Sequence, residues 1–247
     1  MKRLLATSAL LGTLATGTFA ADLKEMSDEE RALFRAEVRA YLFENPEVIM
    51  QAVEILQQRE QQQQVQADVD LVAQNADAIF NDGYSWVGGN PEGDIVLVEF
   101  LDYRCGYCKR AHDEVAQLLE SDGNIKLIVK ELPILGEASV LASRFAVAVK
   151  QVSGDDSYKA VADALMTFQG DISMPALRRL GSTFGLDMAA VEERMNGDEV
   201  TAEIAATRAL AGTLAINGTP TFILQDELLR GYLPLDQMQA RVADKRG

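Results

Sequence analysis

A nearly continuous apolar run over residues 95–100, rich in isoleucine and valine, is the feature that most constrains the fold of this chain. Such a run is typical of a β-strand that is covered on both faces. An amphipathic stretch follows it, stops at Asp122-Gly123, and leads to a second apolar run at residues 125–131. A strand, a helix and a strand in this order predict a right-handed βαβ unit with parallel strands.

Residues 137–214 have helical patterns almost throughout, with helix starts predicted at Ser173 and Asp187. This block stands between two groups of predicted strands, so it is an insertion into one sheet. We therefore expect an α/β domain over residues 83–247 with a helical insertion at about 137–214. Strand patterns return near the C-terminus and a final helix follows them, at residues 221–224, at 228–230 and from about 235.

The segment ahead of this domain, residues 21–82, is predicted to form a helical arm. Ser27 followed by Glu30 fits a capping box, and Asn45 before Pro46 fits the start of a second, longer helix. Turn-forming residues then cluster between the arm and the first strand, and they mark a domain boundary.

An apolar stripe with alternating spacings of three and four residues runs along the longer helix. Its positions are Ile49, Ala52, Leu56, Val65, Val69, Val72, Ala76 and Ile79. Because a helix gains most of its stability by packing such a stripe, we expect residues 21–82 to be an oligomerisation segment. Seven of the ten residues 57–66 are glutamine, which buries little apolar surface. A solvated linker and a stripe that packs on the chain's own domain are the two alternatives.

The N-terminus has the pattern of a secretory signal peptide. Lys2 and Arg3 precede an apolar run over residues 4–14, and small residues lead to a predicted cleavage site after Ala20. The apolar run is shorter than the roughly 20 residues that a membrane-spanning helix needs. We expect residues 1–20 to be removed and the mature protein to be soluble in the periplasm, with a retained membrane anchor as the alternative.

Cys105 and Cys108 are the only cysteines of the 247-residue chain. A chain of this length builds a core without disulfide staples, so chemistry explains the pair better than stability does. Thiols of exported proteins can be oxidised and stay oxidised. The net charge of −15 makes nucleic acid an unexpected partner.

The two cysteines are predicted to lie where the first strand ends and a helix begins. Backbone N–H groups and the helix dipole favour an anion there, in this case a thiolate. Cys105, at the start of the helix, is expected to be the exposed attacking sulfur, and Cys108, one turn later, the buried sulfur that resolves a mixed disulfide. Lys109 and Arg110 add positive charge nearby.

Other roles for the pair stay open. A zinc or copper site needs about four ligands, and His112 is the one histidine that the chain adds to the two thiolates. We expect no resident metal and no cofactor, and we expect His112 at the surface. A structural disulfide that closes so short a loop would constrain the unfolded chain little. A surface-assembled structural protein with an incidental redox pair is a further alternative.

The residues around the cysteines resemble the active-site region of DsbA-type thioredoxin-fold proteins. The run 98–109, VEFLDYRCGYCK, carries this likeness, which extends over residues 83–247. The run 218–222, GTPTF, is similar to the family's loop whose proline is cis and faces the cysteines. The resemblance implies a thioredoxin-like fold in which Thr219 and Pro220 bind the client, beside backbone that is free to pair with a client strand.

The resemblance also implies a buried acid and a partner for it. Glu99 stands six residues before Cys105, where the family places a carboxylate behind the resolving cysteine. Such a group can shuttle the proton of Cys108. Lys130, on the following strand, matches the lysine that pairs with this acid, since an unpaired buried charge would be costly. An outward-facing Glu99 is the alternative.

The dipeptide between the cysteines, Gly106-Tyr107, lacks the histidine of the strongly oxidising family members. Together with Thr219 it resembles the oligomeric disulfide isomerases, and the helical arm resembles the ScsC-like branch. The resemblance implies a periplasmic oxidoreductase that forms, reduces or isomerises disulfides of exported client proteins, with isomerisation favoured in an oligomer, and that depends on a membrane redox partner. A monomeric DsbA-like oxidase is the alternative within this class, and a periplasmic copper or zinc carrier is the alternative outside it.

Overall fold

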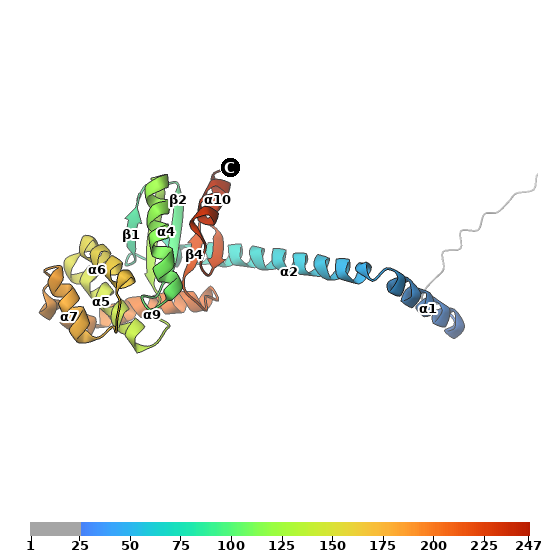
Figure 1. Cartoon of the computed structure of the whole chain (residues 1–247), viewed down its shortest axis with the longest axis horizontal. Coiled ribbons are helices and arrows are strands. Elements are labelled where there is room, and N and C mark those ends of the chain that lie inside the picture. The colour runs from blue at the N-terminus through green and yellow to red at the C-terminus, as the bar shows by residue number, and fades with distance from the viewer. Residues whose placement is uncertain (1–25) are drawn as a thin grey trace, which may run out of the picture. The chain divides into compact units, whose positions relative to one another are not determined.

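The structure is a computed structural model that describes residues 26–247 (Figure 1). The predicted signal peptide, residues 1–20, lies outside these residues. No helix in the described part of the chain is long and apolar enough to cross a membrane. The elements are α1 (Asp28–Glu44), α2 (Glu47–Gln74), α3 (Ala76–Phe80), β1 (Trp86–Gly89), β2 (Ile95–Leu101), α4 (Gly106–Asp122), β3 (Ile125–Glu131), α5 (Glu137–Ser153), α6 (Asp155–Thr167), α7 (Met174–Thr183), α8 (Met188–Met195), α9 (Asp198–Thr213), β4 (Thr221–Leu224), β5 (Glu227–Arg230) and α10 (Leu235–Arg246).

Five strands form one mixed sheet in the order β1-β3-β2-β4-β5. Strands β2 and β3 are parallel and are joined by α4, with Ile95 opposite Ile125 and Leu101 opposite Glu131. The other neighbouring strands pair antiparallel. The predicted thioredoxin-like α/β fold is therefore confirmed, and so is the helical insertion, which consists of α5 to α9 between β3 and β4.

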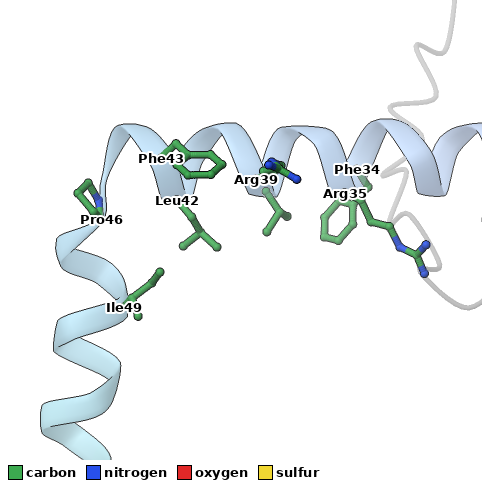
Figure 2. A pocket seen from close by; sticks show the side chains of 8 residues that line it. Phe34, Arg35, Arg39, Leu42, Phe43, Pro46 and Ile49 are labelled. Carbon is green, nitrogen blue, oxygen red and sulfur yellow. The ribbon is translucent and has the colours of Figure 1, made fainter.

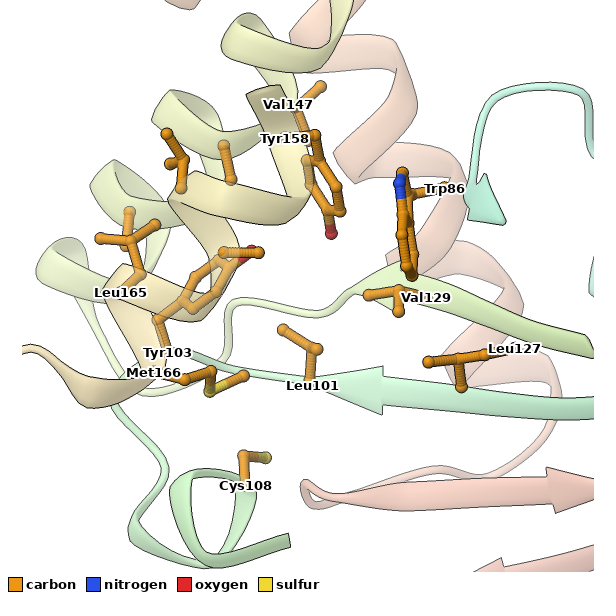
Figure 3. Close-up of a cluster of buried hydrophobic side chains, with 14 of the residues drawn as sticks. Trp86, Leu101, Tyr103, Cys108, Leu127, Val129, Val147, Tyr158, Leu165 and Met166 are labelled. Atoms are coloured by element: carbon orange, nitrogen blue, oxygen red, sulfur yellow. The ribbon is translucent and has the colours of Figure 1, made fainter. Parts of the chain in front are cut away.

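The two faces of the sheet are covered by different hydrophobic clusters, because side chains alternate along each strand. The first cluster lies on the face that carries Leu101 and Val129 and includes residues of α4, α5, α6 and α10; Figure 3 shows part of it. The second cluster lies on the face that carries Phe100 and Ile128 and includes residues of α2, α3 and α9. The sheet is thus buried on both sides, as the apolar run of β2 requires.

The chain divides into two compact units between Arg59 and Glu60. In the first unit, α1 begins with the predicted capping box, in which Ser27 and Glu30 bond each other's backbone N–H groups. No residue of α1 is buried. Leu42 and Ile49 point to the inner side of the bend between α1 and α2, where side chains of both helices line an open cavity of about 500 Å³ (Figure 2).

Residues 60–82 belong to the second compact unit, although we expected them in the arm. The side chains of Val72 and Ile79 are 2% and 0% exposed in the second cluster. Asp68 accepts hydrogen bonds from the Arg230 guanidinium of β5 at 2.6 and 3.0 Å. The part of the apolar stripe that contains Val72 and Ile79 therefore packs on the chain's own domain, and the unit begins before residue 83 because the end of α2 and α3 complete its core.

We predict that Val72→Ala lowers the free energy of unfolding of this unit by about 1–2 kcal/mol, because it removes buried methyl groups and leaves a cavity. Val65→Ala is the matched control, since Val65 is one heptad earlier on α2 and 55% exposed. Its effect should stay within about 0.5 kcal/mol. Urea unfolding of both variants measures the difference, and equal effects would contradict the packing of residues 60–82 on the domain.

Candidate active site

The turn between β2 and α4 positions the two cysteines. Cys105 is the N-cap residue of α4, with extended backbone angles of φ −76° and ψ 116°. Its sulfur accepts a hydrogen bond from the Cys108 backbone N–H at 3.4 Å, in the place where a serine or aspartate oxygen usually caps a helix. The helix start therefore places the Cys105 sulfur beside a backbone N–H donor and at the positive end of the helix dipole.

The loop before β4 lies against this sulfur. The Cys105 thiol donates a hydrogen bond to the Thr219 carbonyl oxygen at 3.0 Å, and the Thr219–Pro220 peptide bond is cis. The structure thus brings Cys105, Cys108, Thr219 and Pro220 together from distant parts of the sequence. The expected exposure of Cys105 is corrected: its side chain is 7% exposed, because this loop covers it.

Cys108 is completely buried, one turn into α4. Burial raises the pKa of the Cys108 thiol well above its usual range, and the negative charge of Glu99 raises it further. The two sulfurs are therefore unequal. The Cys105 sulfur accepts one capping hydrogen bond and is slightly exposed to solvent, whereas Cys108 holds its proton in the core.

Glu99 lies on β2, on the face of the sheet that α4 covers. Its side chain is 4% exposed, and its Oε1 atom is one of three buried side-chain atoms that have no hydrogen-bond partner among the described residues. Burial raises the pKa of Glu99 to about 7, a shift that the charge of His112 opposes and that of Glu131 increases. This carboxyl group can therefore gain or lose a proton near neutral pH.

The expected pairing of Glu99 with Lys130 is wrong. Glu99 is in register with Val129 and Lys130 with Phe100, so the two side chains leave opposite faces of the sheet. The ammonium group of Lys130 is instead bonded at 2.6 Å to Asp82, and it also contacts Ala78 and Ser85. Lys130 therefore fastens the segment after α3 to the back of the sheet.

A second buried acid, Glu131, was missed in the sequence analysis. It shares a sheet face with Glu99 and accepts hydrogen bonds from the hydroxyls of Tyr103, Tyr158 and Ser143 at 2.6 to 2.7 Å. Burial raises the pKa of Glu131 to about 7, although these hydrogen bonds oppose the shift. Glu131 stands two residues after the apolar Val129 on β3, so the alternation of side chains along the strand could have indicated that this acid faces inward.

Asp102 was missed as well, although it stands three residues before Cys105. Its buried carboxylate accepts backbone N–H bonds from Arg104, Ile134 and Leu135, and its carbonyl oxygen accepts the N–H of Cys105. Asp102 therefore ties the active-site turn to the loop after β3. The position of this acid, directly after the apolar strand and before the cysteine pair, was the sequence signal that could have identified it.

The dipeptide between the cysteines is open to solvent. A Cβ atom at Gly106 would meet nothing within 4 Å, and the side chain of Tyr107 is 62% exposed. The Tyr107 ring lies 6.0 Å from that of Tyr232, whose other neighbour is the Arg110 guanidinium at 4.6 Å. Lys109 donates to the Phe168 carbonyl oxygen at 2.8 Å. Tyr107, Tyr232 and Arg110 form an exposed aromatic and basic surface beside the redox pair.

His112 does not lie free at the surface. Its Nε2 atom is 3.1 Å from the Asp163 carboxylate of α6, and its side chain is 23% exposed. Among residues 26–247 there is no group of three or more His, Cys, Asp or Glu side chains that could hold a metal ion.

Comparison with known proteins follows the same division of the chain. Residues 96–243 match the DSBA-like thioredoxin domain family, and residues 30–63 match the N-terminal domain family of the copper resistance protein ScsC. Curated Na(+)/H(+) antiporters NhaA of Salinispora tropica and Salinispora arenicola are 24% and 26% identical over 156 residues, and this chain spans 24% of the length of each.

Three solved structures are similar to this one. A thioredoxin-like oxidoreductase from Silicibacter pomeroyi is 42% identical, with 69% of this chain and 96% of that chain covered and a TM-score of 0.65. The thiol-disulfide exchange protein alpha-DsbA2 from Wolbachia pipientis is 29% identical, with 73% and 96% covered and a TM-score of 0.67. Proteus mirabilis ScsC in a transitional conformation is 26% identical, with 90% and 97% covered and a TM-score of 0.65. The chain therefore belongs to the family of DSBA-like thioredoxin-fold oxidoreductases, and it carries an ScsC-type N-terminal segment ahead of the domain.

Proposed function

We propose that this protein exchanges disulfides with exported client proteins in the periplasm, through Cys105 and Cys108. The observation that carries the proposal is the unequal setting of the two sulfurs. The Cys105 sulfur caps α4 and touches the Thr219 carbonyl, whereas Cys108 is buried with a raised pKa. A nucleophile and a protected resolving thiol are what a two-step exchange requires.

In the direction that reduces a client, the Cys105 thiolate attacks a client disulfide. One sulfur of the client leaves as a thiolate and the other is held in a mixed disulfide with Cys105. Cys108 then loses its proton and attacks the Cys105 sulfur, which releases the second client thiolate and leaves the Cys105–Cys108 disulfide. Oxidation of a client runs the same steps in reverse, and isomerisation ends with a client thiolate displacing Cys105.

The surroundings of the pair favour a polypeptide as the substrate. The Thr219 carbonyl oxygen, next to the cis bond to Pro220, lies 3.0 Å from the Cys105 sulfur, where an extended client segment would place its backbone. Tyr107 and Tyr232 offer rings to the residues that flank the client cysteine. The export signal predicted for residues 1–20 and the similarity to a solved periplasmic thioredoxin-like protein from Salmonella enterica both support a periplasmic site of action, where a membrane redox partner would reset the pair.

Replacement of Cys105 by serine should abolish turnover, because no thiolate then forms the mixed disulfide. Turnover is measured as reduction or reshuffling of a model protein that contains mispaired disulfides. Cys108→Ser should instead accumulate a covalent protein–client adduct, since the resolving thiol is lost. Wild-type turnover by the Cys105→Ser protein would refute the assignment.

We further propose that the first compact unit assembles copies of the chain and that the assembled protein acts as an isomerase. α1 has no buried residue, and Leu33 and Phe43 are each 72% exposed, so a single copy leaves this apolar surface in water. The likeness of residues 30–63 to the N-terminal domain of ScsC supports this role for the segment. A monomeric oxidase is the alternative.

Light scattering of residues 21–247, beside a chain that starts at Glu60, tests the assembly. We expect an oligomer for the longer chain and a monomer for the shorter one, because the shorter chain keeps the second compact unit and loses the exposed apolar helix. Monomers in both samples would contradict assembly and favour the oxidase.

A further inference from the structure

The first observation is that none of the described strands carries a cationic side chain on the same face of the sheet as Glu99. Its nearest positions along and across the strands are apolar, and Lys130 leaves the opposite face. Glu131, the other polar residue on this face of β3, is an acid that is already bonded to three hydroxyls. A proton that Cys108 gives to Glu99 therefore needs a route out of the core that does not use the lysine of β3.

The second observation is a cavity of about 80 Å³ between the sheet and helices α4 and α6. Glu99 lines it from β2, His112 from α4, and Asp163 with Lys159 from α6. A water molecule needs at least about 15 Å³ of such space and also polar partners, and Glu99, His112, Lys159 and Asp163 supply such partners in this lining, so the cavity has room for water between them. Glu99 is the buried acid of this lining, and its Oε1 atom has no hydrogen-bond partner among the described residues.

The outer end of the cavity leads to solvent. His112 is 23% exposed, and its imidazole is 3.1 Å from Asp163, whose side chain is 40% exposed. Lys159 bonds the same carboxylate and is 47% exposed. The imidazole of His112, which an acid holds in place, thus stands between a buried carboxyl group and the solvent.

We propose that His112 is a positioning residue for the resolving step: it relays protons between Glu99 and solvent across this cavity and supplies the positive charge that the sheet does not give to Glu99. This inference rests on the proposed thiol-disulfide exchange. As Cys108 attacks the mixed disulfide, its proton passes to the Glu99 carboxylate. The proton then crosses the cavity to the His112 imidazole, which has released a proton of its own to the solvent and so returns to the charged form that is paired with Asp163. No oxidant is consumed beyond the mixed disulfide itself.

The charges around Glu99 agree with this role. Besides burial, which raises the pKa of Glu99 to about 7, the two charges that act on it are those of His112, which lowers the pKa, and Glu131, which raises it. Cys108 of α4 faces Glu99 from the active site, and Tyr158, Lys159 and Asp163 of α6 line the cavity.

The test separates the two chemical steps by stopped flow with Ellman's reagent. The reduced protein releases thionitrobenzoate when Cys105 forms the mixed disulfide, and again when Cys108 resolves it. In the wild type, the rate of the second release should rise with pH through about 7, as Glu99 becomes a carboxylate. In His112→Asn, the first release should be unchanged. The second should be roughly tenfold slower at pH 7, with its rise displaced upward by roughly one pH unit, because Glu99 loses its cation.

Three further variants serve as controls for the His112→Asn effect. Glu99→Gln should also slow the second release, and adding His112→Asn to it should change nothing further, because the relay has lost its inner end. Asp163→Asn leaves His112 in place and should displace the pH profile in the same direction by less. Arg178→Gln, which breaks the exposed pair between Arg178 of α7 and Glu192 of α8, should match the wild type.

A second release that has the wild-type rate and pH profile in both His112→Asn and Asp163→Asn would overturn the inference. So would a His112→Asn effect that is equally large with Gln at position 99. If the wild type showed no first release, the proposed thiol-disulfide exchange would fail instead, so the two failures are distinguishable.

Discussion

The cap of α4 by a sulfur atom is the interaction on which the rest of this site depends. A helix leaves its first backbone N–H groups without intrahelical partners, and a side chain at the N-cap normally satisfies one of them. Here Cys105 does so, and the same geometry makes it the sulfur nearest to the Thr219 carbonyl. The helical period then fixes Cys108 one turn further in, where α4 packs against the sheet and no solvent reaches the thiol. A single local arrangement thus creates one reactive and one protected sulfur.

Protection of Cys108 has a cost, since a thiol that cannot ionise needs a base before it can attack. In the proposed exchange Glu99 of the sheet is this base, and the alternation of side chains places Lys130 on the far side. An uncompensated carboxylate in the core would be expensive, and the raised pKa of Glu99 reflects this. Glu99 and His112 line the same cavity, and in our proposal the compensating positive charge comes from His112 on α4, the helix that also carries the two cysteines.

Sequence patterns predicted the elements whose signals are local. The apolar runs of β2 and β3, the helical insertion and the N-caps Ser173 and Asp187 appear where they were expected, because strand burial and helix capping depend on neighbouring residues. Strand β1 was missed, since two of its four residues are glycines that give no strand pattern. The packing of residues 60–82 was misassigned because an apolar stripe is the same whether it packs on its own domain or on another copy. The partner of Lys130 was misassigned because a resemblance to a family indicates which residue type stands at a position, but not which face of the sheet its side chain leaves.

The difference between the two sulfurs can be measured by limited alkylation of the reduced protein at neutral pH, followed by mass spectrometry of the peptides that contain each cysteine. The structure predicts that Cys105 is alkylated at least roughly tenfold faster than Cys108, because the thiolate is the nucleophile and Cys108 is both inaccessible and protonated. Equal rates, or faster modification of Cys108, would contradict the assignment of Cys105 as the attacking sulfur and with it the mechanism built on that turn.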